Sequence, residues 1–188
     1  MPEEWTVSAI TRAMLPVLLA LTAVEVVGSG LVLGSFEATL YKYPSLLVLV
    51  PVTIGTAGNL GSILASRLST SFHLGTLSFS PTDDHLAGNA LATVTLALTV
   101  FPVVGAGAWA ATRLTGASTD LGVLTVVAVS FASGAALAVL AVVVTVIATY
   151  CAYRLRLDPD DVVIPVVTNV CDVLGVVVLF VVVQLLVN

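Results

Sequence analysis

The stretch VIPVVTNVCDVLGVVVLFVVVQLL, from Val163 to Leu186, decides the fold class of this protein. It is an almost unbroken apolar run, long enough for one helix to cross the roughly 30 Å hydrocarbon core of a bilayer. One residue breaks the pattern, because Asp172 places a carboxylate among valines and leucines. An Asp at the centre of a membrane helix costs roughly 2.5 to 3.5 kcal/mol, so a partner that offsets this cost is expected.

The whole chain has the composition of an integral membrane protein. Its 188 residues are 59% hydrophobic and only 9% charged, with a mean hydropathy of +1.14. A soluble domain carries about a quarter charged residues. The net charge of -5, with six Lys and Arg residues in total, argues against nucleic-acid binding, which needs a basic face. Cys151 and Cys171 lack metal-site spacing and are interpreted as small apolar residues.

Five apolar windows are long enough to span a bilayer. They cover approximately residues 14–34, 44–68, 86–111, 121–150 and 162–187. Strands are disfavoured because the runs are long and continuous rather than short and alternating. The sequence therefore predicts an all-α integral membrane fold, with residues 1–188 forming a single domain of five transmembrane helices.

The basic residues predict the orientation of the chain in the cell membrane. With the N-terminus in the cytoplasm, the inner side holds Arg12, Arg67, Arg154 and Arg156. The outer side then holds Lys42 and Arg113. We expect a multi-pass plasma-membrane protein with a cytoplasmic N-terminus and, after five spans, an external C-terminus.

Polar side chains from three predicted helices fall at related depths. From the helical rise of 1.5 Å per residue, Glu25 and Asp172 lie roughly 16 and 15 Å from the inner face, and Asn59 roughly 8 to 10 Å. Asn169 stands three residues before Asp172 and shares its helix face. Carboxylate and amide oxygens suit hard cations or their hydration water. We predict a cation pathway with Asp172, Asn59, Asn169 and Glu25 as candidate metal-binding residues.

Other interpretations of these residues stay open. Asn59 could be an interhelical hydrogen-bond bridge, and Glu25 could be protonated and merely hydrogen-bonded. The row Gly55, Gly58 and Gly61 is typical of close helix packing.

Two polar groups lie outside the spans. His73 and His85, placed in a loop with Asp83 and Asp84, could form a surface cation site, but a solvated loop is the simpler interpretation. The second group consists of Asp158, Asp160 and Asp161. It is interpreted as the solvated start of the fifth helix, near the positive end of the helix dipole.

Two segments resemble a known family. GNLGSILASRLST, residues 58–70, resembles the second membrane helix of the magnesium transporters of solute carrier family 41. LDPDDVVIPVVTNVCDVLG, residues 157–175, is similar to the fifth helix of the same family. These transporters and the bacterial MgtE magnesium channels share a five-helix transmembrane domain.

The resemblance implies a homodimer with a pore between the subunits. In it, Asp172 would hold a largely hydrated Mg²⁺ and Asn59 would line the pore nearby. Animal members fuse two five-helix halves, so this half-size chain is expected to pair with itself or with a half-size paralogue. MgtE proteins also carry a cytoplasmic N-domain and CBS domains that gate the pore; this sequence shows neither, so we expect different gating. The Gln that usually follows their Gly-Asn-x-Gly is replaced here by Ser62 or Ile63.

The predicted function is a channel or transporter for divalent cations, with Mg²⁺ as the foremost cargo and the lipid bilayer as its setting. A proton-coupled carrier using Glu25 and Asp172 is an alternative, and a non-transporting membrane scaffold subunit is another. An intramembrane enzyme is disfavoured, because no span carries paired histidines or a Glu-Glu motif that could supply a nucleophile and a base.

Overall fold

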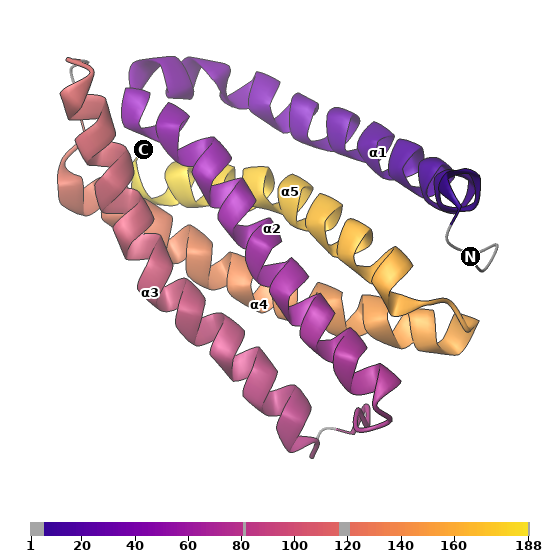
Figure 1. Cartoon of the computed structure of the whole chain (residues 1–188). Coiled ribbons are helices and arrows are strands. Elements are labelled where there is room, and N and C mark those ends of the chain that lie inside the picture. The colour runs from indigo at the N-terminus through magenta and orange to yellow at the C-terminus, as the bar shows by residue number, and fades with distance from the viewer. Residues whose placement is uncertain (1–5, 81, 117–120, 188) are drawn as a thin grey trace.

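Five long helices make up most of the chain that the structure, a computed structural model, describes, namely residues 6–80, 82–116 and 121–187 (Figure 1). They are α1 (Val7–Lys42), α2 (Pro44–His73), α3 (Asp84–Leu114), α4 (Val123–Leu155) and α5 (Pro159–Leu186). No strand occurs in these ranges, so the predicted all-α membrane fold is confirmed. All five helices are long and apolar enough to cross a membrane.

Local sequence signals set several helix ends. The hydroxyl of Thr6 accepts a hydrogen bond from the N–H of Ala9 at the start of α1. Asp83 and Asp158 cap α3 and α5 in the same way, through carboxylate oxygens that accept backbone N–H groups. Each cap satisfies donors that the first turn of a helix leaves without an intrahelical partner.

The helices extend beyond most of the apolar windows read from the sequence. They contain 28 to 36 residues, which corresponds to about 42 to 54 Å at the helical rise, longer than a bilayer core. Polar end turns therefore continue the helices outside the hydrocarbon region. At two ends the helix is shorter than its window: α4 begins at Val123 with Gly122 as its N-cap, and α5 ends at Leu186.

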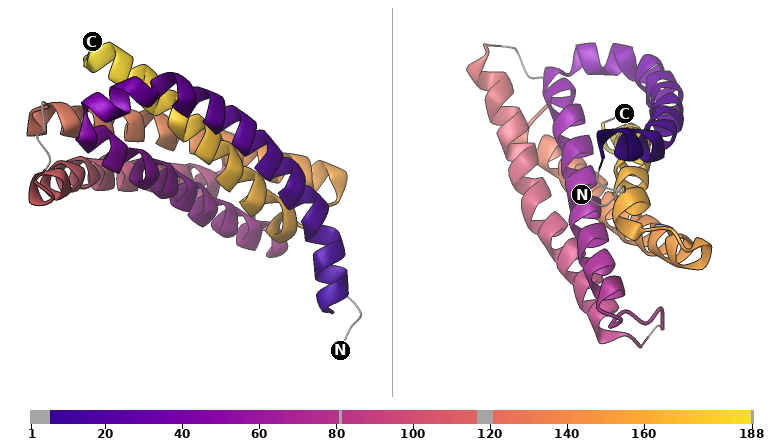
Figure 2. Two further views of the ribbon diagram at one scale, coloured as in Figure 1. Left: turned by 90° about the horizontal axis from the view of Figure 1, so that it is seen from above. Right: turned by 45° about the vertical axis from the view of Figure 1, so that its right-hand side comes forward.

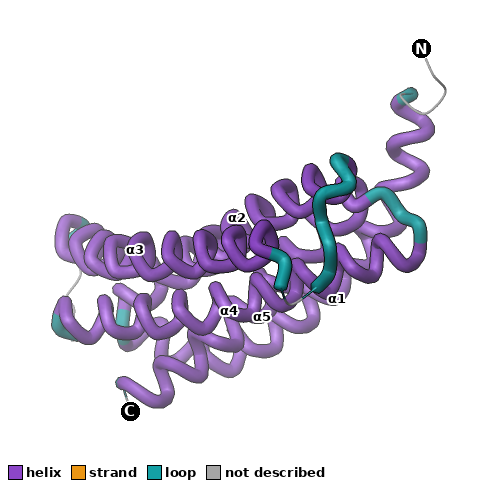
Figure 3. The backbone as a smooth tube through the Cα atoms, turned by 90° about the horizontal axis from the view of Figure 1, so that it is seen from below, coloured by secondary structure: helices purple, strands orange, loops and turns teal. Residues whose placement is uncertain are grey.

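Helix α2 is central to the bundle and packs against each of the other four helices. α5 packs against α1, α2 and α4, whereas α3 lies against α2 and α4. α1 and α2 are joined at Tyr43 and diverge from there, and α5 runs between them and crosses behind α2 in this view (Figure 1). The N-terminal end of α1 projects past the other helices (Figure 2). The described loops gather at the two ends of the bundle (Figure 3).

Small residues allow the close contacts inside the bundle. A Cβ added at Gly134 of α4 would overlap the ring of Phe101 in α3. One added at Gly105 would lie 2.8 Å from Cβ of Ser130. In contrast, no described residue in the most apolar window of α1 is buried within the chain. That surface suits a lipid environment or another membrane helix rather than water.

Candidate functional site

The carboxylate of Asp172 in α5 lies against the backbone of α2. A Cβ added at Gly58 would be 3.4 Å from Oδ1 of Asp172 and 3.5 Å from Cγ2 of Thr168. A Cβ at residue 58 would therefore be in ordinary van der Waals contact with this carboxylate, which shows how closely α5 approaches the backbone of α2. Asp172 is half-buried, and the residue that follows Gly58 is the predicted site residue Asn59. The structure thus brings these two segments of α2 and α5 to the same level of the bundle.

A pair of hydroxyls joins α2 to α5 one turn away from Asp172. The Oγ of Ser62 lies 2.9 Å from Oγ1 of Thr168. Each hydroxyl is also 2.9 Å from a carbonyl of its own helix, that of Gly58 for Ser62 and that of Ile164 for Thr168. Because a hydroxyl has one hydrogen, one of them donates across the interface and the other donates to its backbone. This bridge fixes the rotation of α5 that points Asp172 at Gly58.

Asn169 lies on a neighbouring strip of α5, toward α1. Its Nδ2 donates to the carbonyl of Pro165 at 3.1 Å. Its Oδ1 is buried and has no hydrogen-bond partner among the described residues. The side chain lines an otherwise apolar cavity of about 150 Å³ between α1 and α5, together with Leu21, Val24, Val170, Val173 and Leu174. The carbonyl oxygen of the Asn169 side chain is thus a buried acceptor that no described residue satisfies.

Glu25 of α1 brings a second carboxylate toward Asp172. A Cβ added at Gly28, one turn after Glu25, would be 3.0 Å from Cγ1 of Val173, the residue after Asp172. This close packing places Glu25 near the level of Asp172. Two carboxylates in a membrane interior repel each other when ionised, and a cation between them removes the repulsion.

Asn59 is exposed on the outside of a single chain, although its neighbours Gly58 and Leu60 are buried. Its side chain therefore faces away from the packed interface between α2 and α5. Within one chain, Asn59 is available to lipid, solvent or another subunit. The four predicted site residues are consequently divided: Asp172 faces α2, Asn169 and Glu25 lie between α1 and α5, and Asn59 faces outward.

The basic residues of the three surrounding helices lie toward helix ends. α5 contains no Lys or Arg, and those of α1 and α2 are Arg12, Lys42 and Arg67. Arg67 donates from Nε to the side-chain oxygen of Asn89 in α3. Arg67 is thus directed at the α2–α3 contact rather than at Asp172.

Comparison with the families of known proteins matches residues 50–182 to MgtE, described as a divalent cation transporter. The match covers more than half of the chain and includes α3, α4 and most of α2 and α5. The chain belongs to the MgtE family. The predicted resemblance is therefore confirmed, and this MgtE family member is a multi-pass membrane protein of a family of transporters, not enzymes. No curated protein and no solved structure matches the chain.

The MgtE match separates the site residues into two groups. Asn59, Asn169 and Asp172 lie within the matched residues, whereas Glu25 precedes them. Ser62 and Thr168 carry no predicted role, although Thr168 stands four residues before Asp172 and so shares its helix face. That spacing is the signal that could have identified the bridge.

Two histidines lie differently from the sequence prediction, which placed both in a loop. His73 is the last residue of α2, and His85 lies in the first turn of α3. Nε2 of His73 is 3.7 Å from Oδ1 of Asp158, so His73 meets the start of α5.

Asp83, which the sequence groups with these histidines, caps α3. The N–H groups of Leu86 and Ser78 donate to its carboxylate and hold the pKa of Asp83 below its usual value.

Proposed function

We propose that this chain transports divalent cations, Mg²⁺ foremost, along a path that passes Asp172. The observation that carries the proposal is the position of this carboxylate, which lies in a membrane-spanning helix against Gly58 and near the level of Glu25. No basic residue of α5 balances these charges. A mobile dication would balance both of them, which offsets the cost of a charge in the bilayer.

A pore between two copies of the chain fits the arrangement of polar groups. Asn59 is exposed beside the buried Gly58 that contacts Asp172. A second subunit facing this surface would bring another Asn59 and another Asp172 toward a shared axis. Mg²⁺ dehydrates reluctantly, so a ring of amide and carboxylate oxygens would contact its water shell rather than strip it. A half-size paralogue could supply the same surface in place of a second copy.

A proton-coupled carrier is a second candidate, because Glu25 lies near the level of Asp172 and repulsion between two ionised carboxylates there would be relieved by a proton as well as by a cation. In that mechanism, one carboxylate would exchange a proton for the transported ion.

The proposed location of the chain is the plasma membrane, with the N-terminus inside the cell. The orientation rests on the distribution of basic residues.

Ion flux through the purified protein in liposomes tests the proposal. We expect external Mg²⁺ to raise the signal of a trapped magnesium indicator without an imposed pH gradient. Uptake that needs a pH gradient and moves protons would favour the carrier. An absence of Mg²⁺ uptake under both conditions would contradict transport and favour a scaffold subunit.

A further inference from the structure

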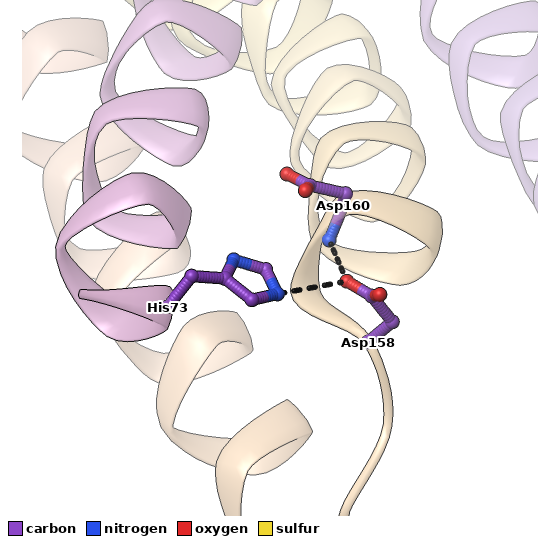
Figure 4. A group of neighbouring side chains, drawn as sticks. All are labelled: His73, Asp158 and Asp160. Atoms are coloured by element: carbon purple, nitrogen blue, oxygen red, sulfur yellow. Dashed lines mark hydrogen bonds and ion pairs between the residues drawn. The ribbon is translucent and has the colours of Figure 1, made fainter. Parts of the chain in front are cut away.

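The end of α2 meets the first turn of α5 in a group of three side chains with metal-binding atoms (Figure 4). His73 closes α2, Asp158 caps α5, and Asp160 lies in the first turn of α5. One ligand atom from each of the three lies within 4.8 Å of the others. The side chains of His73 and Asp158 are 48% and 52% exposed, so an ion can reach them from solvent.

The imidazole of His73 is held in place by contacts outside this group. Its Nδ1 lies 3.0 Å from the carbonyl oxygen of Ser69, one turn back in α2. When Nδ1 carries the proton and donates there, Nε2 has a free lone pair, and Nε2 is the atom that faces Asp158. Metal-binding histidines almost always donate their second ring N–H to such a carbonyl or carboxylate. The ring of Phe72 packs edge-on against the imidazole at 5.5 Å.

The carboxylate of Asp158 is fixed by the start of α5. As the N-cap, it accepts the backbone N–H of Asp160 at Oδ1, at 3.0 Å, and Asp160 follows in the first turn. A protonated His73 would balance only one of these two negative charges. A dication bound to neutral His73 would balance both, so charge favours a divalent metal over a simple ion pair.

We propose that His73, Asp158 and Asp160 form a second divalent-cation site, one that prefers a transition metal such as Zn²⁺ or Co²⁺. Imidazole nitrogen suits these ions, whereas Mg²⁺ prefers an all-oxygen shell. The site is thereby chemically distinct from the path at Asp172. Water molecules would complete the coordination at this exposed position.

The location of the site connects it to the transport path. Its ligands lie on α2 and α5, the two helices that carry Asn59 and Asp172. His73 is fourteen residues beyond Asn59, and Asp158 is fourteen residues before Asp172, which is about 21 Å along each helix. A bound metal would fasten these two helix ends together and so restrict their relative motion.

Zn²⁺ binding to the full chain in detergent, measured by titration calorimetry with Mg²⁺ in excess, tests the proposal. We expect His73→Gln to weaken Zn²⁺ binding about tenfold or more, because it removes a direct ligand. His85→Gln is the matched control and should bind as the wild type does. Asp172→Asn should also keep Zn²⁺ binding, whether or not that variant transports Mg²⁺, which separates this site from the transport path.

Two further variants keep the test decisive if His73→Gln folds poorly. Asp158→Asn retains a good N-cap residue, and Asp160→Asn leaves the cap of α5 intact; both should weaken Zn²⁺ binding. With Co²⁺ alone, the wild type should show visible absorption bands of a low-symmetry site that are lost in His73→Gln. Equal Zn²⁺ affinity in the wild type and these variants, or an equal loss in His85→Gln, would overturn the proposal.

Discussion

Oδ1 of Asp172 occupies the space that a side chain at Gly58 would approach, since an added Cβ there would be 3.4 Å away. This distance is ordinary van der Waals contact, so the fold accommodates a methyl group. On the proposed path, the methyl would reduce the access of water or a cation to one side of the carboxylate. If the cation passes Asp172 as proposed, residue 58 is therefore a sensitive position.

Gly58→Ala should preserve the fold and lower Mg²⁺ uptake severalfold in liposomes. Gly55→Ala is the matched control, one turn earlier on α2, where an added Cβ meets nothing within 4 Å. Both changes favour the helix by about 1 kcal/mol or less. Uptake that falls equally in the two variants would contradict a specific role for the space beside Asp172.

Glu25→Gln should reduce the apparent affinity for Mg²⁺ severalfold, because it removes one of the two carboxylates proposed to attract the cation. The effect should be smaller than that of Asp172→Asn, since Glu25 acts from the neighbouring helix. Glu37→Gln, an exposed residue of the same helix, is the control. Mg²⁺ dependence of uptake gives the affinity, and an unchanged value in Glu25→Gln would remove Glu25 from the path.

Gly134→Ala should destabilise the bundle by about 1 to 3 kcal/mol, the usual cost of overpacking. The added methyl overlaps the ring of Phe101, which is fully buried between α3 and α4. Gly107→Ala in α3 should be harmless, because nothing lies within 4 Å of its added Cβ. Thermal unfolding of the two variants in detergent measures the difference, and equal melting temperatures would refute the packing assignment.

The cap at Asp83 predicts a pH dependence of stability. Four hydrogen bonds, from Ser78, His85 and Leu86, favour the ionised carboxylate and hold the pKa of Asp83 below 3.8. The contribution of Asp83 to the free energy of unfolding is therefore complete above the unfolded-state pKa of about 3.9. It is lost as the pH falls through the lower folded-state pKa.

Asp83→Asn tests this cap. The melting temperature of this variant should lie below that of the wild type near neutral pH, and the gap should close in acid. Asp84→Asn, which accepts none of those four bonds, should show no such convergence. A gap between wild type and Asp83→Asn that stays constant down to acid pH would mean that the charge of Asp83 is irrelevant.

The sequence was sufficient to predict the membrane class and the five helices, because long apolar runs leave few alternatives. It also predicted that polar groups of three helices lie at related depths. It did not predict that Gly58, rather than Asn59, faces Asp172. Each residue turns a helix by about 100°, so the contacting face depends on interhelical packing such as the Ser62–Thr168 bridge.

The contact between His73 and Asp158 does not follow from the sequence either. Proximity along the chain groups His73 with Asp83, whereas the structure pairs His73 with a residue at the start of another helix. Such pairings depend on how α2 and α5 cross and where each ends. Hydropathy specifies neither property, since it registers only that a segment is apolar.

The most direct test of the central claim compares Mg²⁺ uptake by wild-type protein, Asp172→Asn and Asp161→Asn in liposomes at matched protein density. Asp161 is an exposed carboxylate in the first turn of the same helix. A direct interaction between a carboxylate and the cation at close range is worth more than about 1.4 kcal/mol, which is a factor of ten in affinity. Asp172→Asn should therefore lower uptake about tenfold or more. Asp161→Asn should transport as the wild type does. Undiminished uptake by Asp172→Asn would contradict the claim that the transported cation passes Asp172.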